Sequence, residues 1–469
     1  MNNLKPLLSL GLCYVATHAS QGGPLLLHPD NPHYFLWRGK PTVLITSGEH
    51  YGAVLNLDFD YAIYLNELES HKFNLTRTFP GFYVEPPGTF KIAGNTLAPA
   101  PGRFICPWAR SSEPGYANGG NKFDLAKWDE AYFARLRDFM TQASKRGVVV
   151  ELNLFTPFYE ENIWELSPVN GRNNINGIGD IARTNVYTLD RSGGVLTIQE
   201  TMVKKLVIEL NGFDNLYYEL CNEPYFGGVM LDWQSHMADV IVETEKKLPN
   251  KHLISWNVAN GSKTVTERHA AISIFNFHYA SPPKTVALNY GLNKVIGLNE
   301  TGFRGTNNMP YRQEAWAFLL AGGGLYNHLD FSFSSGHERG DFEYPENQPG
   351  GGNAEFRRQL KVLRDFINSF EFVRMKPDQS FIKSEGTNAI AAYSLAEPGK
   401  QYAAYCFSGT NGLPRNLSLT LHLPNGVYRV QWMDVLSGKI VRTERIKSAG
   451  EVTIVTPDCS GEIALRVIR

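Results

Sequence analysis

The chain has 469 residues, with 45 basic and 46 acidic side chains and a formal charge of −1. Such a balanced charge argues against a nucleic-acid-binding protein and against a polybasic membrane-binding surface, so neither partner is expected. The hydrophobic content of 43% argues against a disordered chain. The length allows roughly two or three domains with large cores.

The first twenty residues have the pattern of a secretory signal peptide. Lys5 gives a weakly positive start, residues 6–16 are mostly apolar, and Ala19 and Ser20 give a small-residue end. We therefore expect a signal peptide over residues 1–20 and a secreted or periplasmic protein. A disordered or locally packed N-terminus is the alternative. The segment is too short to span a bilayer, and no other stretch is apolar enough to do so.

The cysteines beyond this segment are far apart in the sequence, at Cys106, Cys221, Cys406 and Cys459. There is no Cys-x-x-Cys motif and no histidine cluster with zinc spacing, so neither a metal nor another cofactor is expected. A chain of this size does not need a disulfide framework. A late bond between Cys406 and Cys459 and two buried free thiols are the alternatives.

Short apolar runs alternate with helix-like stretches from about residue 41 to residue 333. The eight runs are Pro41–Thr46, Phe73–Phe79, Val148–Phe155, Leu216–Leu220, Leu253–Val258, Ile272–His278, Lys294–Asn299 and Gly324–Asp330. Runs of this kind are typical of parallel strands that are buried on both faces. Eight of them predict an α/β fold, a closed (β/α)8 TIM barrel, which we place at residues 21–374.

The stretches between the runs show helical periodicity. Between the second and third runs, Tyr132, Leu136, Phe139 and Met140 share one face, and Gly147 follows as a helix end. Further helices are expected at Leu231–Leu248, Tyr311–Ala321 and Asn353–Phe372.

Three long irregular segments interrupt this rhythm, at about Val84–Lys122, Thr156–Leu196 and Ser334–Gly352. Each follows a strand and precedes a helix. In a barrel such loops lie at the C-terminal face, where the active sites of TIM barrels are found. The extra chain length is therefore expected around one mouth, although surface loops also tolerate passive insertions.

The pattern changes after about Met375 to short alternating strands separated by turn signals. Asn425-Gly426 and Ser437-Gly438 read as tight turns. These residues, 375–469, predict a small antiparallel β-sandwich that packs beside the barrel. Carbohydrate binding by the sandwich itself is the less favoured alternative.

Two glutamates stand at the ends of two predicted strands. Glu223 lies in Asn222-Glu-Pro224, where the proline stops the fourth strand, and Glu300 ends the seventh. The two carboxylates should therefore meet at the same mouth of the barrel. Hydrolysis of a glycosidic bond needs such a pair, one group to protonate the leaving oxygen and one to attack the anomeric carbon or activate water. An ion pair at the barrel rim is the alternative for either glutamate alone.

These residues resemble the clan A retaining glycoside hydrolases, the superfamily that includes the family 5 cellulases and mannanases. The resemblance rests on Tyr-Glu-Leu-Cys-Asn-Glu-Pro at 218–224 and Ile-Gly-Leu-Asn-Glu-Thr-Gly at 296–302, and it spans about residues 35–372. It implies that Glu223 is the acid/base, that Glu300 is the nucleophile, and that Asn222 binds the 2-hydroxyl of the sugar.

Further positions agree with this resemblance in part. Arg77, near the end of the second strand, would keep Glu300 ionised. His278 and Tyr279 end the sixth strand, where the clan often has His-x-Tyr with the tyrosine against the nucleophile. Here the tyrosine is displaced by one residue, which leaves its role open. Structural ion pairing of Arg77 and a core position for His278 are the alternatives.

Other candidates for binding the substrate lie around the predicted mouth. Glu49 and His50, which follow the first strand, are candidates for the glycone side. Because sugars stack on aromatic rings, the aromatic residues of the long loops are candidate platforms, although each is individually more typical of a loop core. These residues are Trp108, Phe158, Tyr159 and Trp164, together with Tyr225 and Phe226 after the predicted acid/base.

Within the clan, the barrel, the sandwich and the Gly-Glu-His-Tyr-Gly segment at 48–52 look most similar to the family 158 endo-β-1,3-glucanases. The sequence therefore predicts a retaining β-glycoside hydrolase with a carbohydrate substrate. The alternatives are an exo-acting glycosidase for another β-linked sugar, a carbohydrate-binding barrel without catalysis, and a metal-dependent barrel hydrolase. The sugar, the linkage and the oligomeric state are not fixed by these patterns.

Overall fold

The computed structural model describes residues 23–384, 390–408, 413, 417–459 and 461–469. Its central feature is a sheet of eight parallel strands in the order β4-β13-β12-β11-β10-β9-β8-β5. The strands are β4 (Leu44–Gly48), β5 (Leu75–Thr78), β8 (Val149–Asn153), β9 (Leu216–Glu219), β10 (Leu253–Asn260), β11 (Ile272–His278), β12 (Val295–Glu300) and β13 (Leu325–Leu329). The predicted (β/α)8 barrel is confirmed.

Asn74, immediately before β5, joins the first strand of the barrel to the second. Its side-chain oxygen accepts a hydrogen bond from the backbone N–H of Ile45 (2.9 Å), and its amide donates to the carbonyl of Val43 (2.9 Å). The backbone N–H of Asn74 also donates to the carbonyl of Ile45 (3.3 Å). One side chain thus supplies the bonds that a regular strand pairing would provide between β4 and β5.

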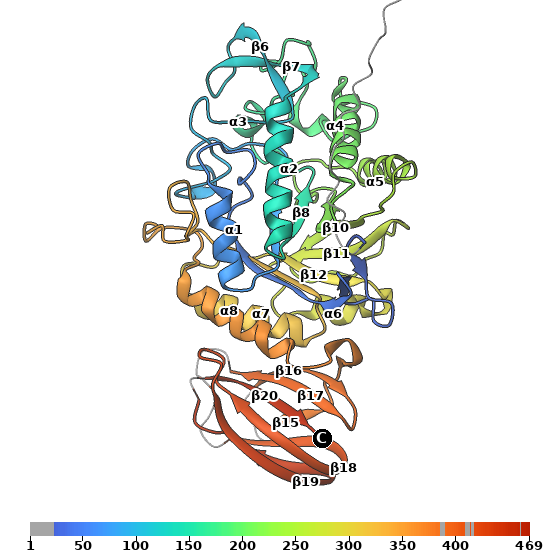
Figure 1. Ribbon diagram of the computed structural model, residues 1–469, viewed down its shortest axis with the longest axis vertical. Helices are drawn as coiled ribbons and strands as arrows, with labels where there is room; N and C mark the ends of the chain where they lie inside the picture. Colours follow the sequence, from blue (N-terminus) through green and yellow to red (C-terminus); the bar gives the residue numbers. More distant parts are fainter. Residues whose placement is uncertain (1–22, 385–389, 409–412, 414–416, 460) are drawn as a thin grey trace, which may run out of the picture.

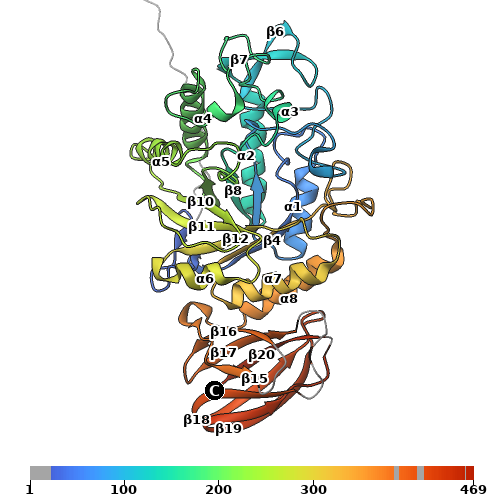
Figure 2. The same cartoon turned by 180° about the vertical axis from the view of Figure 1, so that it is seen from behind.

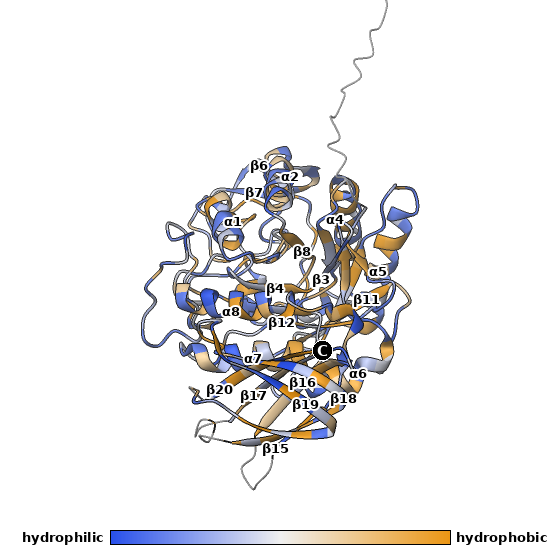
Figure 3. Cartoon of the chain, turned by 60° about the horizontal axis from the view of Figure 1, so that its bottom comes forward, coloured by the Kyte–Doolittle hydropathy of each residue, from blue (hydrophilic) through white to orange (hydrophobic). Residues whose placement is uncertain are grey.

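Helices surround the barrel, as Figures 1 and 2 show from opposite sides. They are α1 (Tyr61–Ser70), α2 (Glu130–Lys145), α4 (Val195–Leu210), α5 (Leu231–Glu245), α6 (Lys284–Asn289), α7 (Asn308–Leu320) and α8 (Ala354–Ile367). Asp129 begins α2, because its carboxylate accepts from the N–H groups of Ala131 and Tyr132. In Figure 3 the strands of the barrel are mostly orange, whereas helices such as α8 carry blue stripes on their outer faces.

The long loops lie at the C-terminal mouth of the barrel and contain structure of their own. The first carries a hairpin of β6 (Trp108–Pro114) and β7 (Asn121–Trp128), which we had not predicted, and the second carries the short helix α3 (Glu161–Trp164). This hairpin is at the end of the molecule away from the C-terminal strands (Figure 1). Before β4, three short strands, β1 (Leu26–Leu27), β2 (Phe35–Trp37) and β3 (Lys40–Thr42), form a separate small sheet.

The C-terminal part is an antiparallel, sandwich-like unit with its own apolar core, as predicted. Its strands are β14 (Lys376–Pro377), β15 (Ile382–Ser384), β16 (Ala391–Glu397), β17 (Gln401–Phe407), β18 (Ser418–Met433), β19 (Ile440–Val455) and β20 (Glu462–Ile468). The turn predicted at Asn425-Gly426 is wrong: β18 continues through it, with an irregularity in its register opposite β19. Residues 435–437, by contrast, form a turn between β18 and β19.

The sandwich packs under α7 and α8 of the barrel (Figure 1). Arg312 of α7 forms a buried ion pair with Glu462, and the ring of Trp316 stacks on Tyr405 at 5.3 Å between centroids. Cys406 and Cys459 are both free, so the suggested disulfide is wrong. The domain limits at 21–374 and 375–469 stay predictions, and the signal peptide predicted at 1–20 lies outside the described residues.

Among the described residues, none of the helices combines the length and the apolar character that a membrane span requires.

Candidate active site

Glu223 and Glu300 meet in one cavity at the C-terminal mouth of the barrel. Glu300 is the last residue of β12, and Glu223 follows β9 after a short extension of the chain. Both carboxylates line a cavity of about 390 Å³ and are only slightly exposed, 8% for Glu223 and 5% for Glu300. The meeting of two carboxylates that are 77 positions apart in the sequence follows from the parallel strands, which all end at this mouth.

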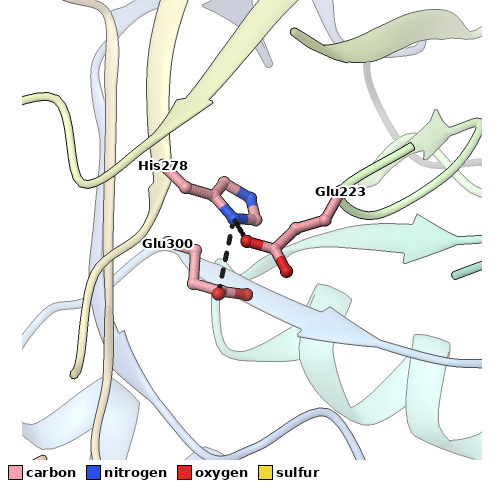
Figure 4. A group of neighbouring side chains, drawn as sticks. All are labelled: Glu223, His278 and Glu300. Carbon is pink, nitrogen blue, oxygen red and sulfur yellow. Dashed lines mark hydrogen bonds and ion pairs between the residues drawn. The ribbon is translucent and has the colours of Figure 1, made fainter. Parts of the chain in front are cut away.

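His278, the last residue of β11, lies between the two carboxylates (Figure 4). Its Nδ1 is 3.1 Å from Oε1 of Glu223 and 3.4 Å from Oε1 of Glu300. One oxygen of each glutamate and a nitrogen of the histidine all lie within 4.8 Å of one another. Burial lowers the pKa of His278, but the two carboxylates outweigh burial and raise it to about 9. The imidazolium form therefore persists at neutral pH.

Both oxygens of Glu300 accept strong hydrogen bonds. The hydroxyl of Tyr51 donates to Oε2 (2.8 Å), the hydroxyl of Tyr279 donates to Oε1 (2.8 Å), and Nη1 of Arg77 lies 3.2 Å from Oε2. Burial by itself raises the pKa of Glu300, but the charge and hydrogen bond of His278 and the charge of Arg77 hold it well below its usual range. Glu300 is thus a buried carboxylate that is kept ionised.

Arg77 is fully buried beneath the cavity and connects Glu300 to the barrel interior. Its Nε is 2.5 Å from Glu151, and its Nη2 is 2.5 Å from Glu219. Burial raises the pKa of Glu151 to about 8, and the nearby Glu219 adds to this effect although Arg77 opposes it. Glu219 is a buried, hydrogen-bonded residue of the barrel interior.

A tyrosine of the second long loop holds the side chain of Glu223. The hydroxyl of Tyr159 donates to Oε2 of Glu223 (2.8 Å), and Nδ2 of Asn222 donates to the same hydroxyl (3.0 Å). Because Oδ1 of Asn222 accepts from Arg77 (2.8 Å), the amide has a fixed orientation with its N–H₂ group toward the cavity side. This group also lies 3.5 Å from Oγ1 of Thr156, so both amide protons of Asn222 have an acceptor within the protein.

Three residues of this cluster have a left-handed backbone: Tyr51 (φ 62°), Glu223 (φ 39°) and Tyr279 (φ 51°). Such conformations cost free energy in residues with a side chain, and they persist where the surrounding structure enforces them, often at functional sites. At Tyr279 the turn in the backbone follows a register irregularity between β11 and β12. It brings the hydroxyl to Glu300 although the tyrosine is displaced by one residue from the expected spacing.

Glu223, His278 and Glu300 also have the ligand types of a divalent-cation site. Two features of the cluster disfavour such an ion. The raised pKa of His278 keeps its ring protonated at neutral pH, and a protonated ring has no free lone pair for a metal. In addition, hydroxyl and guanidinium donors already occupy both oxygens of Glu300. Both features disfavour a metal ion at this cluster.

Seven of the predicted binding residues do not line the cavity: Glu49, Arg77, Trp108, Phe158, Trp164, Tyr225 and His278. Trp108 and Trp164 are each only 1% exposed; Trp164 packs on Phe158 (4.8 Å between centroids) and donates its indole N–H to a backbone carbonyl. They are anchors of the long loops, because a loop of this length needs an apolar core of its own. Glu49 is also buried, with its carboxylate bound to the N–H groups of Gly52 and Ala53, which fastens the loop after β4.

The structure adds cavity residues that the sequence did not single out. They are Tyr51, Phe79, Tyr83, Glu85, Phe90, Leu97, Thr156, Asn260 and Phe303, beside the predicted His50, Tyr159, Phe226 and Tyr279. Phe90 and Phe303 form part of an aromatic rim, in which the ring of Phe90 lies 5.3 Å from Tyr159 and 6.4 Å from Phe303. For four of them, Glu85, Phe90, Leu97 and Thr156, the only sequence signal was a position in a long loop that follows a strand.

The third long loop supports the first and does not line the cavity. Gln348 accepts a hydrogen bond from the N–H of Ala93 (3.0 Å), and Ser335 is within 3.4 Å of the amide of Asn56. Of the three long loops, the first two contribute residues to the lining of the cavity and the third contributes none. These contacts agree with the prediction that all three long loops gather at one mouth of the barrel. The first two line the cavity, and the third supports the first.

Comparison with known protein families and with curated protein sequences gives no match for this chain. Solved structures, by contrast, share its fold. A glycoside hydrolase of family 5 from Bacteroides vulgatus ATCC 8482 superimposes with a TM-score of 0.61 at 15% identity, over 95% of this chain and 93% of that one. A candidate glycoside hydrolase from the same strain gives 0.64 at 14% identity, over 95% and 82%.

The chain has the fold of the family 5 glycoside hydrolases. A noncanonic maltogenic alpha-amylase, AmyB from Thermotoga neapolitana, also superimposes, with a TM-score of 0.51 at 14% identity over 91% of this chain and 99% of that one. Because enzymes with such different names share the fold, the reaction and the substrate of this chain must be argued from its own site.

Proposed function

We propose that the protein is a retaining β-glycoside hydrolase in which Glu223 is the acid/base and Glu300 is the nucleophile. The proposal rests on one observation above all: oxygens of the two carboxylates lie within 4.8 Å of each other in a single cavity. Retaining enzymes hold their two carboxyl groups about 5–5.5 Å apart, whereas inverting enzymes need about 6.5–9.5 Å to admit a water molecule. An oxygen pair within 4.8 Å is closer to the retaining range than to the inverting range and so supports double displacement.

In the first step, the ionised Glu300 attacks the anomeric carbon and forms a glycosyl ester, while the bond to the leaving oxygen breaks and that oxygen takes the proton of Glu223. Tyr51, Tyr279 and Arg77 orient the attacking carboxylate. In the second step, Glu223 removes a proton from water, the water oxygen attacks the same carbon, and Glu300 leaves as a carboxylate. The configuration at the anomeric carbon is retained after two inversions.

The assignment of the two roles is supported by the surroundings of each glutamate. Glu300 has a lowered pKa and donors on both oxygens, which suits a nucleophile that must be ionised before the substrate binds. Glu223 is followed by Tyr225, whose hydroxyl donates to its Oε1 (3.3 Å), and by Phe226, which lines the cavity beside it. The substrate class that we favour is a β-linked oligosaccharide or polysaccharide, with β-1,3-glucan as one candidate.

The test combines two variants with a stereochemical measurement. Glu300→Ala should lower kcat/KM by at least about 10³-fold on β-glucans, mannan or aryl β-glycosides, whichever the wild type hydrolyses. Glu113→Gln, in the exposed β6–β7 hairpin, is a control that should keep full activity. Proton NMR of the first product should show the β-anomer. Release of the α-anomer, or an undiminished rate in Glu300→Ala, would overturn the proposal.

A further inference from the structure

The cavity contains a third carboxylate that the double displacement does not use. Glu85 lies in the first long loop, is 3% exposed, and lines the same cavity as Glu223 and Glu300. No ion pair among the described residues includes Glu85. A buried carboxylate without a cationic partner is costly, so its persistence next to a reaction centre indicates a binding task.

The surroundings of Glu85 fix its position and leave acceptor sites free. Oε1 accepts from the hydroxyl of Tyr83 (2.8 Å), and Oε2 accepts from Nδ2 of Asn95 (2.6 Å). The backbone N–H of Glu85 donates to the carbonyl of Leu97 (2.9 Å), which closes the loop around it. A carboxylate has about four acceptor sites, so each oxygen can still receive a donor from the cavity.

His50 adds a second polar side chain to the cavity lining beside Glu85. Its Nδ1 lies 3.0 Å from Oδ1 of Asn95, whose amide nitrogen already donates to Glu85. The bonds thus assign the proton to Nδ1 of His50 and leave Nε2 of this cavity-lining ring as an acceptor. Glu85 and His50 therefore present mainly hydrogen-bond acceptors to the cavity. Such a surface suits ligand groups that donate hydroxyl protons.

The charge of the cavity points to the same kind of ligand. Of the described residues that line it, Glu85, Glu223 and Glu300 are acidic and none is a lysine or an arginine. The cations that contact Glu300, Arg77 and His278, are fully buried behind it and pair with the catalytic carboxylates. An anionic sugar would meet carboxylates without a free cation, whereas an uncharged sugar can donate hydroxyl hydrogen bonds to them.

Glu85 and Glu223 belong to loops that follow different strands of the barrel. The loop of Glu85 follows β5 and His50 follows β4, whereas Glu223, the proposed acid for the leaving group, follows β9. We propose that Glu85, held by Tyr83 and Asn95 beside His50, binds hydroxyl groups of the glycone and makes the enzyme select uncharged sugars over uronic acids. The inference rests on the proposed glycosidase function and adds the substrate class of its glycone site.

The test compares neutral and anionic substrates that are otherwise matched: 4-nitrophenyl β-glucoside with 4-nitrophenyl β-glucuronide, and β-mannan with polymannuronate. Wild type should hydrolyse the neutral member of a pair at least about 100-fold more efficiently. Glu85→Gln should raise KM for the neutral member about 10- to 100-fold with a smaller change in kcat, since a hydrogen bond to a charged group is lost. Glu85→Gln should also lower the ratio between kcat/KM for the neutral substrate and kcat/KM for the anionic substrate.

Glu85→Asp separates contact from charge, because it shortens the side chain and keeps the negative charge. We expect this variant to lose affinity for the neutral substrate and to keep the rejection of uronides. Glu113→Gln is the matched control, and thermal unfolding shows whether each variant is folded. Equal hydrolysis of both members by wild type, or an unchanged KM in a folded Glu85→Gln, would overturn the inference and leave the proposed function intact. No hydrolysis of any substrate by wild type would overturn both.

Discussion

The hydroxyl of Tyr279 donates a hydrogen bond of 2.8 Å to Oε1 of Glu300, although its spacing in the sequence left its role open. The contact depends on a left-handed backbone at Tyr279 and on the shifted register between β11 and β12. A tyrosine at this place both orients the nucleophile and favours its ionised form. It therefore links a local backbone irregularity to the chemistry of the site.

Tyr279→Phe should lower kcat/KM about 10- to 100-fold, because the ionised Glu300 loses one of its donors and is less well oriented. Most of the loss should be in kcat, since the hydroxyl acts on the nucleophile. Steady-state kinetics measure the effect. An unchanged kcat would show that the remaining donors, Tyr51 and Arg77, suffice to orient Glu300.

The strands of the barrel could be predicted from the sequence because parallel strands that are buried on both faces have continuous apolar runs. The same runs predicted that Glu223 and Glu300 stand at strand ends. Glu300 does end β12, whereas β9 ends at Glu219 and Glu223 lies four residues beyond it. Their meeting in one cavity then followed from the topology alone. This part of the site needed no knowledge of loop conformation.

The remainder of the site depends on contacts that no local pattern contains. Trp108 and Trp164 were candidate platforms with a loop-core position as the alternative, and their burial agrees with the alternative. No sequence pattern indicated Glu85 as a site residue. Its position depends on the loop contact with Leu97 and on the hydrogen bond from Asn95. Tyr279 likewise required the backbone conformation at the end of β11. Loop cores and left-handed residues are set by tertiary packing, which spacing in the sequence does not report.

Glu223→Ala should abolish the acid and base functions and keep the nucleophile. The rate on substrates with a poor leaving group should fall by about 10²- to 10⁴-fold, and the rate on 2,4-dinitrophenyl glycosides should fall much less in the first step. Added azide should restore turnover and give a β-glycosyl azide, because a small anion can use the vacated space. The absence of any azide product, with equal losses on both substrates, would contradict the acid/base role.

His278 should make the stability of the protein depend on pH. Its folded pKa of about 9 lies above the ordinary value of 6.5, so its contribution is fully present below pH 6.5 and is lost as the pH rises through about 9. The difference in free energy of unfolding between wild type and His278→Gln should therefore shrink from pH 6 to pH 9.5, by on the order of 3 kcal/mol. Urea unfolding at several pH values measures it. A constant or growing difference would show that the ring is not protonated between the two carboxylates.

Removal of divalent cations should leave the enzyme unaffected. The protonated His278 and the occupied oxygens of Glu300 leave no set of free ligands for a metal at the reaction centre. Dialysis against EDTA followed by assay should give the original kcat, and added Zn²⁺ or Mn²⁺ should not raise it. A loss of activity that a specific cation restores would favour a metal-dependent hydrolase.

The covalent intermediate on Glu300 provides the most direct test of the central claim. A 2,4-dinitrophenyl 2-deoxy-2-fluoro-β-glycoside of the preferred sugar should inactivate the enzyme with release of one equivalent of dinitrophenol, because the fluorine slows the second step. Mass spectrometry of the digested protein should then find the fluoroglycosyl group on the peptide that contains Glu300, and Glu300→Ala should not be labelled. Labelling of another residue, or equal labelling of Glu300→Ala, would contradict the account.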